Sequence, residues 1–125
     1  MFEDLIELFN NQLKDIGELN FGQMPDYPDD VININFSAGN SPIFSINSLQ
    51  PMIRQPAIQI VTRGLDYTAT VTKLNECMET LMNYVGPLGS SHQVMSISSS
   101  SDILPLGRDK QNRYLFSINI VLKIH

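Results

Sequence analysis

The chain of 125 residues has few charged side chains, a single cysteine and no long apolar run. Charged residues make up 17% of the sequence, below the quarter or so that is usual in soluble domains. Uncharged polar residues fill the deficit. Such a surface can be covered by other proteins without desolvating many charges, which suits a subunit with large interfaces. A monomer with a merely polar surface would have the same composition, so both interpretations stay open.

Basic residues are scarce as well, because acidic residues outnumber them 13 to 8 and the net charge is -5. Proteins that bind nucleic acids usually carry a cluster of basic residues that neutralises phosphates. The sequence has no such cluster, so we expect no specific nucleic-acid binding. A subunit lining a channel for DNA is compatible with this charge, since passage requires no tight binding.

The single cysteine, Cys77, cannot form an internal disulfide, so the sequence implies no oxidised secreted scaffold. The first fifteen residues are acidic and amphipathic, unlike a signal peptide, which has a basic start and a continuous apolar run. No segment approaches the roughly 20 apolar residues of a membrane span. We therefore expect a cytoplasmic protein that contacts no membrane.

Residues for catalysis or metal binding are equally sparse. A zinc site needs cysteine and histidine at close spacing, which His92, His125 and Cys77 do not have. The sequence contains no glycine-rich phosphate loop, and its aspartates lack the spacing of a calcium loop. We expect no catalytic residue, no cofactor and no metal. An enzyme would require a hidden site, such as His92 meeting Asp102 or Asp109.

Two segments have the three- and four-residue spacing of amphipathic helices. The first spans residues 2–16 and stops at Gly17. The second follows Asp66, which can cap it, and ends before Gly86 and Pro87. Its predicted buried face consists of Tyr67, Val71, Leu74, Met78, Leu81, Met82 and Val85.

Alternating apolar and polar residues predict strands at 31–36, 93–98 and 113–124, and an apolar run predicts one more at 57–63. The Pro/Asp-rich stretch before the first of these strands predicts a loop.

Two other connections look irregular. Residues 37–56 contain Gly39 and three prolines, and within them residues 43–46 form at most a short edge strand. Residues 99–112 predict a connector with a turn-rich tip.

These elements predict one α+β domain over residues 1–125. We expect a two-layer sandwich with a mixed sheet of four to five strands and two helices on one face, in the order α-β-(β)-β-α-β-β. The strands at 57–63 and 93–98 should run parallel, joined by a helical crossover. The last two strands should form a hairpin.

Three segments of the chain occur in an order that is typical of one protein family. The stretch Gly22 to Asp30 leads into the first strand, Gln55 to Tyr67 carries a strand that ends in Arg-Gly, and Leu106 to Tyr114 leads into the last strand. Together they resemble the tail-terminator (minor capsid, tail-completion) proteins of siphophages and Gram-positive prophages. The resemblance covers nearly the whole chain.

The resemblance implies a structural protein without enzymatic activity. It implies a homo-oligomer ring, of six copies, that caps the tail tube, ends its polymerisation and offers a head–tail joining surface. Its partners would be itself, the tail tube protein and a head-completion or connector protein. The chain would act in the host cytoplasm during virion assembly and then in the virion. A head-side connector or adaptor and a host protein-binding module are the alternatives.

The resemblance also implies where contacts form, namely the segment 37–55 and the tip 107–112. Three arginines in or near them could anchor a partner, with solvated surface charge as the alternative. The candidate interface residues are Ile43, Phe44, Ile46, Arg54, Arg63, Arg108, Asp109, Lys110 and Arg113.

Overall fold

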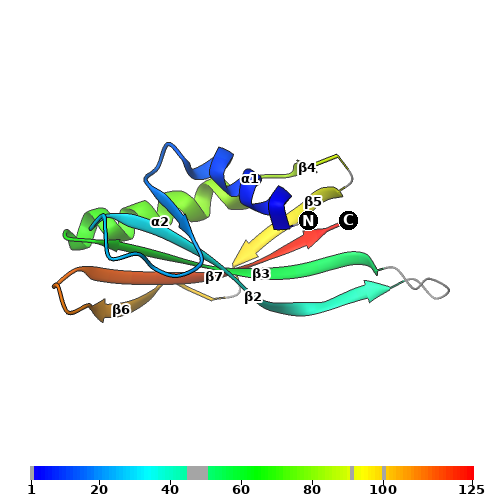
Figure 1. The fold of residues 1–125 in the computed structure, drawn as a ribbon. Helices are drawn as coiled ribbons and strands as arrows, with labels where there is room; N and C mark the ends of the chain where they lie inside the picture. The colour runs from blue at the N-terminus through cyan, green and yellow to red at the C-terminus, as the bar shows by residue number, and fades with distance from the viewer. Residues whose placement is uncertain (1, 45–50, 91, 100) are drawn as a thin grey trace.

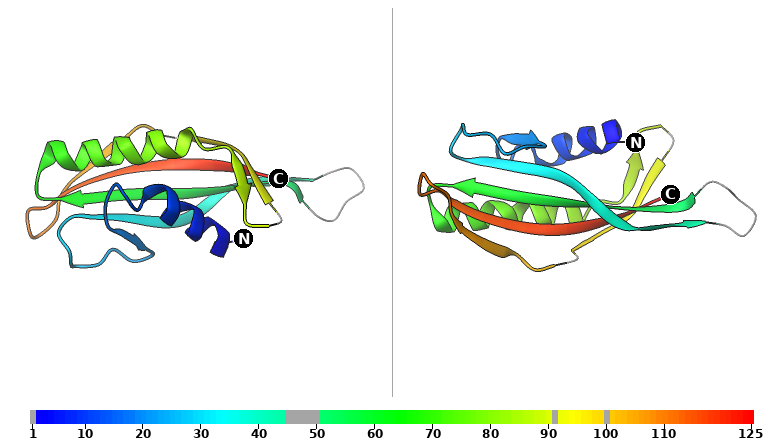
Figure 2. Two further views of the ribbon diagram at one scale, coloured as in Figure 1. Left: turned by 90° about the horizontal axis from the view of Figure 1, so that it is seen from above. Right: turned by 60° about the horizontal axis from the view of Figure 1, so that its bottom comes forward.

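A computed structural model describes residues 2–44, 51–90, 92–99 and 101–125, with only the backbone described for residues 2, 37–44 and 51–52. Two helices lie on the same face of one twisted and curled sheet (Figures 1 and 2). The elements along the chain are α1 (Phe2–Leu13), β1 (Leu19–Phe21), β2 (Val31–Phe44), β3 (Pro51–Gly64), α2 (Tyr67–Met82), β4 (Gly86–Leu88), β5 (His92–Ser99), β6 (Leu104–Arg108) and β7 (Tyr114–Ile124).

The strand β7 is the centre of the sheet, whose order is β1-β2-β3-β7-β5-β4. One edge of β7 pairs with β3, and the other edge is shared by β5 and β6. The β1–β2 pair is parallel and the other pairs are antiparallel. Because β3 and β5 both run antiparallel to β7, they are parallel to each other, as predicted. The chain passes from β3 to β5 through α2, and β7 lies between these two strands in the sheet.

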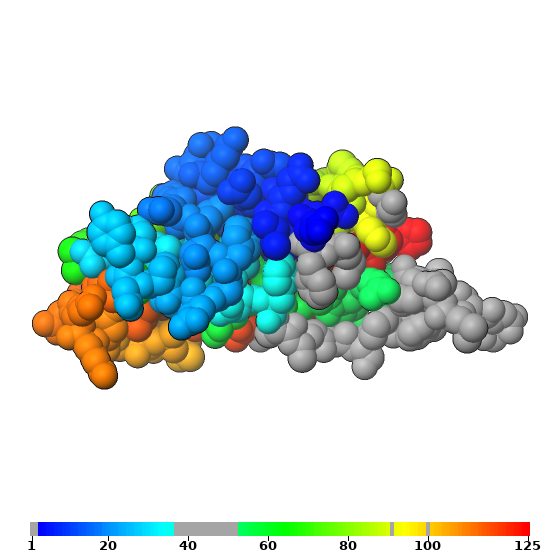
Figure 3. Space-filling view, viewed as in Figure 1, coloured from blue at the N-terminus to red at the C-terminus, as the bar shows by residue number. Residues whose placement is uncertain are grey.

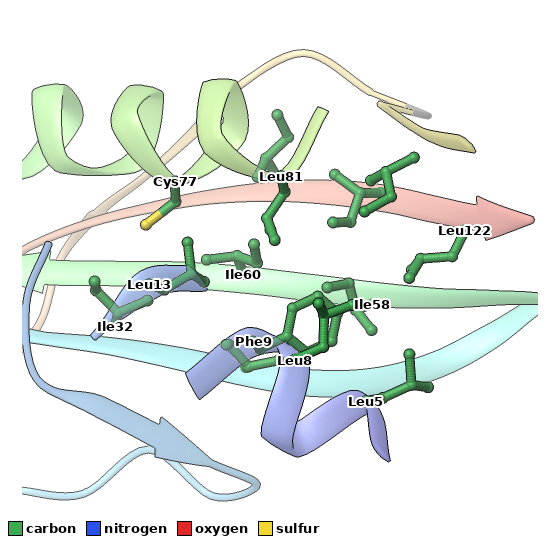
Figure 4. Close-up of a cluster of buried hydrophobic side chains, with 14 of the residues drawn as sticks. Leu5, Leu8, Phe9, Leu13, Ile32, Ile58, Ile60, Cys77, Leu81 and Leu122 are labelled. Atoms are coloured by element: carbon green, nitrogen blue, oxygen red, sulfur yellow. The ribbon is translucent and has the colours of Figure 1, made fainter. Parts of the chain in front are cut away.

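The core lies between the helices and the sheet. Figure 4 shows Phe9 of α1 pointing at Ile58 of β3, while Cys77 and Leu81 of α2 point toward the sheet beside Ile60. All five side chains are completely buried. Burying one aliphatic or aromatic side chain contributes about 1.5–3 kcal/mol, so this layer supplies much of the stability.

The second helix begins where the sequence predicts. The Asp66 carboxylate accepts a hydrogen bond from the Ala69 backbone N–H at 2.8 Å. The predicted buried face is partly wrong, because Tyr67 and Val85 are 51% and 63% exposed. Thr70 and Cys77 are buried instead. Thr70 can be buried because its hydroxyl donates a hydrogen bond to the Asp66 carbonyl at 2.6 Å, so the hydroxyl is not left without a partner.

The predicted sheet of four to five strands is wrong, since the described residues form seven strands. The three strands that were missed are short, namely β1, β4 and β6. Two of them contain proline, which is tolerated where a strand pairs on one side only. Such segments carry no alternation that a sequence pattern could detect. The α+β class and the position of both helices agree with the prediction.

The predicted irregular connection at 37–56 is also wrong. The strand β2 continues to Phe44, β3 starts at Pro51, and the two pair with each other beyond the body of the sheet. Three register shifts interrupt this pairing, which is how the glycine and prolines are accommodated. We call residues 41–44 and 51–53 the arm; they follow the Asn40–Gln55 pair of β2 and β3 and flank or lie beyond the last pair of β3 with β7, Arg54 to Ile124.

Candidate interaction surface at the loop end

Three connections meet at the end of the sheet opposite the arm (Figure 1). They are residues 22–30 before β2, residues 64–66 between β3 and α2, and residues 109–112 between β6 and β7. We call these three segments the loop end. The middle one is tight, because a β-carbon at Gly64 would lie 2.7 Å from Asp30 Oδ1. Packing against Asp30 therefore explains why a glycine follows Arg63 at the end of β3.

Arg63 binds the first of these segments, residues 22–30, through hydrogen bonds. Its side chain lies at the end of β3, and the residue is only 3% exposed. The guanidinium donates from Nη1 to the Pro25 carbonyl at 2.5 Å, from Nη2 to the Pro28 carbonyl at 2.6 Å and from Nε to the Asp29 carbonyl at 3.2 Å. Two residues of this loop are prolines and have no backbone N–H, so the loop has fewer donors for its own carbonyls. The arginine donates to these carbonyls instead.

Arg113 ties the same segment to the β6–β7 turn. It donates from Nε to Asp109 Oδ2 at 2.7 Å and from Nη1 to the Asp26 carbonyl at 2.7 Å. A longer ion pair of 3.3 Å joins Nη1 to Asp29 Oδ1. Asp109 also accepts the backbone N–H groups of Gln111 and Arg113 at 2.9 and 3.0 Å. One carboxylate thus fixes both the turn and the arginine.

The electrostatics of the loop end follow from these contacts. Burial, followed by the nearby Arg113 charge, lowers the pKa of Arg63 from its ordinary value. The backbone hydrogen bond from Arg113 is the main reason that the pKa of Asp109 is lowered. Burial opposes the charge of Arg113, but its hydrogen bonds with Asp109 and Asp29 raise its pKa on balance. A guanidinium stays protonated in proteins, so both arginines are charged at neutral pH, and the lowered pKa of Asp109 favours its ionised form.

Arg108 belongs to an aromatic cluster beside the turn. Its guanidinium donates to the Tyr114 hydroxyl and lies 4.5 Å from the centre of that ring. Tyr67 of α2 packs edge-on against Tyr114 and Phe116, with ring centres 5.3 and 5.0 Å apart. The half-exposed Tyr67 thus connects the start of α2 to β7.

A pocket of about 280 Å³ opens at the loop end, and we call it the arginine pocket. Arg63 and Arg113 lie in its wall, and Lys110 and Gln111 come from the turn. Its full lining is Met24, Asp26, Arg63, Asp109, Lys110, Gln111, Arg113 and Leu115.

The predicted interface residues fall at two ends of the molecule. Arg63, Arg108, Asp109, Lys110 and Arg113 converge at the loop end. The exposed Arg54 lies at the other end of β3, next to the arm.

Two further candidates lie on the arm. Ile43 and Phe44 pair through their backbones with Ile53 and Pro51. Ile46 lies outside the described residues. That any of the candidates contacts a partner stays a prediction.

The sequence analysis missed what Arg63 and Arg113 contact. The two arginines are buried and bind a distant segment: Arg63 donates to carbonyls 34 to 38 residues away, and Arg113 donates to a carbonyl 87 residues away and a carboxylate 84 residues away. One signal was available: Asp109 and Arg113 stand four residues apart across a turn, in a chain with few charges.

The histidines and the cysteine do not come together with the loop-end carboxylates in the described part of the chain. His92 starts β5 near the Ile124 end of β7, whereas Asp109 lies beyond its Tyr114 end, so they form no catalytic pair. Burial raises the pKa of the Cys77 thiol to about 12. Within the described ranges no three His, Cys, Asp or Glu side chains could hold a metal ion. No helix in that part of the chain is long and apolar enough to cross a membrane.

The fold and the loop end define a small α+β protein in which buried arginines order polar loops. The chain matches the model of the bacteriophage tail terminator protein family over residues 8–125, and it belongs to that family. The resemblance seen in the sequence is therefore confirmed. The family is one of structural phage proteins. No curated protein matches the chain.

Proposed function

We propose that this chain caps the phage tail tube, ends its polymerisation and provides the surface that joins the tail to the head. Membership of the tail terminator family is the observation that carries the proposal. The protein acts as a ring of six copies, a minor component of the virion at the head–tail interface. It is made in the host cytoplasm and joins the particle during assembly.

Two features of the subunit suit a ring. A closed ring with one subunit type needs two different surfaces that fit each other head to tail. The loop end and the arm lie at opposite ends of β3 and β7, so each copy can present one to each side. Interfaces of this kind favour rigid, pre-ordered groups, which the buried arginines provide at the loop end.

The arm gives separate support for a partner. Beyond Arg54, β2 and β3 pair only with each other among the described strands. A two-stranded hairpin on its own is marginally stable in water. The arm is therefore suited to being ordered against the tail tube protein or a neighbouring copy.

The net charge of -5 agrees with a channel for DNA rather than a DNA-binding site. A cap must let the genome pass, and a strongly basic lining would retain it. The proposed partners are the tail tube protein, a head-completion protein and further copies of this chain. The protein needs no cofactor, catalytic residue or membrane.

The proposal is tested by deleting the gene from the phage and measuring tails by electron microscopy. We expect overlong tails that are not joined to heads, with normal particles restored when the gene is supplied in trans. Purified protein should also shorten the tubes that the tail tube protein forms in vitro. Tails of normal length on joined particles would contradict the proposal. Normal-length tails without heads would favour a head-side connector instead.

A further inference from the structure

The arginine pocket contains a hydrogen-bond donor that the subunit leaves unused. The Arg113 side chain is only 4% exposed, and its Nε and Nη1 atoms are bonded within the chain. Its Nη2 atom makes no hydrogen bond to the described residues. No fully buried side-chain nitrogen or oxygen of these residues lacks a partner, so Nη2 must reach the solvent in the pocket. An acceptor from outside could use it.

Lys110 adds a cation that pairs with no carboxylate of the described residues, at the rim of the same pocket. Its side chain is exposed, and the ion pairs among the described residues involve only Arg113. Three cationic and two anionic side chains line the pocket. It is thus net positive in a chain whose overall charge is -5. A carboxylate is the group that such a cavity favours, because guanidinium and ammonium donors bind it with charge-assisted hydrogen bonds.

The chain itself carries the complementary surface. Residues 1–21, which lie outside the loop end, contain five of the 13 acidic residues and only one of the eight basic ones, which gives this segment a charge of -4. Residues 2–21 form a continuous region of the molecular surface in Figure 3, coloured dark to medium blue.

On α1, Glu3 and Glu7 are both exposed and stand one helical turn apart. Neither forms an ion pair with the described residues. Glu3 is favoured by the start of the helix, but Glu7 lies beyond its first turn and has no cation three or four residues away. Their mutual repulsion is therefore left uncompensated within one subunit.

We propose that the arginine pocket of one copy receives the carboxylate of Glu7, with Glu3 beside it, from α1 of a second copy. Arg113 Nη2 and the Lys110 ammonium donate to it. The contact joins two different surfaces of the same chain, so it is a head-to-tail contact of the kind that closes a ring. Opposite charge on the two surfaces also disfavours like-to-like pairing. This inference rests on the proposed ring.

The test is a charge swap in a phage that lacks the gene and receives variants in trans. Lys110→Glu should lower the yield of infectious particles at least about tenfold, as expected for repulsion at a close interfacial charge pair. Glu7→Lys should also lower it. The double variant K110E/E7K should recover most of the yield. Thermal melting of each purified variant should remain close to that of the parent, because both side chains are exposed.

Two controls match the variants in charge change and exposure. Lys123→Glu reverses an exposed lysine on β7 away from the pocket, and K110E/D15K reverses an exposed acid outside the Glu3–Glu7 pair. The inference requires that K123E has little effect and that K110E/D15K does not recover the yield.

The inference is overturned if K110E behaves like K123E, or if K110E/E7K recovers no more than K110E/D15K. If gene deletion yields overlong tails while K110E supports normal ones, only this contact is wrong. If deletion itself leaves tails and joining normal, the proposed function fails as well.

Discussion

The two ends of the sheet are ordered in opposite ways. At the loop end, side chains hold irregular backbone: Arg63 and Arg113 together donate four hydrogen bonds to carbonyls of residues 22–30. At the arm, regular backbone pairing continues with no third strand beside it among the described residues. At the first end buried arginines of the same chain bind the loop carbonyls, whereas at the second a strand pair extends past the rest of the sheet among the described residues.

This difference predicts different costs of substitution at the two ends. Replacing Arg63 or Arg113 removes buried hydrogen bonds and must weaken the isolated protein. Ile53 on the arm pairs with β2 beyond the last contact with β7, so replacing it should cost the isolated protein less. Comparing the two ends in the free protein therefore distinguishes residues that stabilise the fold from residues that the isolated protein does not need.

The largest effect is expected for Arg63→Met. Methionine fills a similar volume but donates no hydrogen bond, so the carbonyls of Pro25, Pro28 and Asp29 lose their donor. Because each unsatisfied buried group costs about 1–3 kcal/mol, the free energy of unfolding should fall by about 3 kcal/mol or more. Urea denaturation measures it. Arg54→Ala, an exposed arginine on the same strand, is the control and should change it by less than about 0.5 kcal/mol. Equal effects of the two substitutions would refute this role of Arg63.

An intermediate effect, dependent on pH, is expected for Asp109→Asn. Since the folded-state pKa of Asp109 is lowered, its contribution is present above the unfolded pKa, about 3.9, and is lost as pH falls through the folded pKa. The variant should be less stable than the parent at pH 7, and the difference should shrink below about pH 4. Denaturation curves at pH 7, 5 and 3 give this comparison. A difference that stays constant across that range would count against the carboxylate as the cause.

The smallest effect is expected for Ile53→Thr on the arm. Ile53 is half-buried and pairs with β2 beyond the last contact with β7. Threonine keeps the β-branched shape, so the free energy of unfolding should change by less than about 1 kcal/mol. Urea denaturation in parallel with R63M measures the contrast. A loss as large as that of R63M would show that the arm is part of the folded body.

Sequence patterns were reliable where a residue's environment is set by its near neighbours. The alternation of apolar and polar residues in 114–124 correctly predicted β7, and Asp66 correctly predicted the start of α2. The patterns failed at residues 37–56, because the glycine and prolines there are tolerated by register shifts on an outer strand pair. No local signal reveals such pairing.

The same limit applies to the candidate site. The sequence selected five charged residues of the loop end but could not show that Arg63 and Arg113 point inward. Their carbonyl partners lie far away in the chain, and burial of a guanidinium depends on that distant segment. Only the Asp109 to Arg113 contact spans four residues and lies within reach of a local pattern.

The position of β7 has a consequence for biosynthesis. Its partners β3, β5 and β6 all precede it in the chain, yet none of the three can join the others until residues 114–124 have left the ribosome. Until then the nascent chain exposes strand edges and the apolar face that α2 covers, both of which favour aggregation. Premature termination within this strand should therefore yield insoluble polypeptide rather than a weakened subunit.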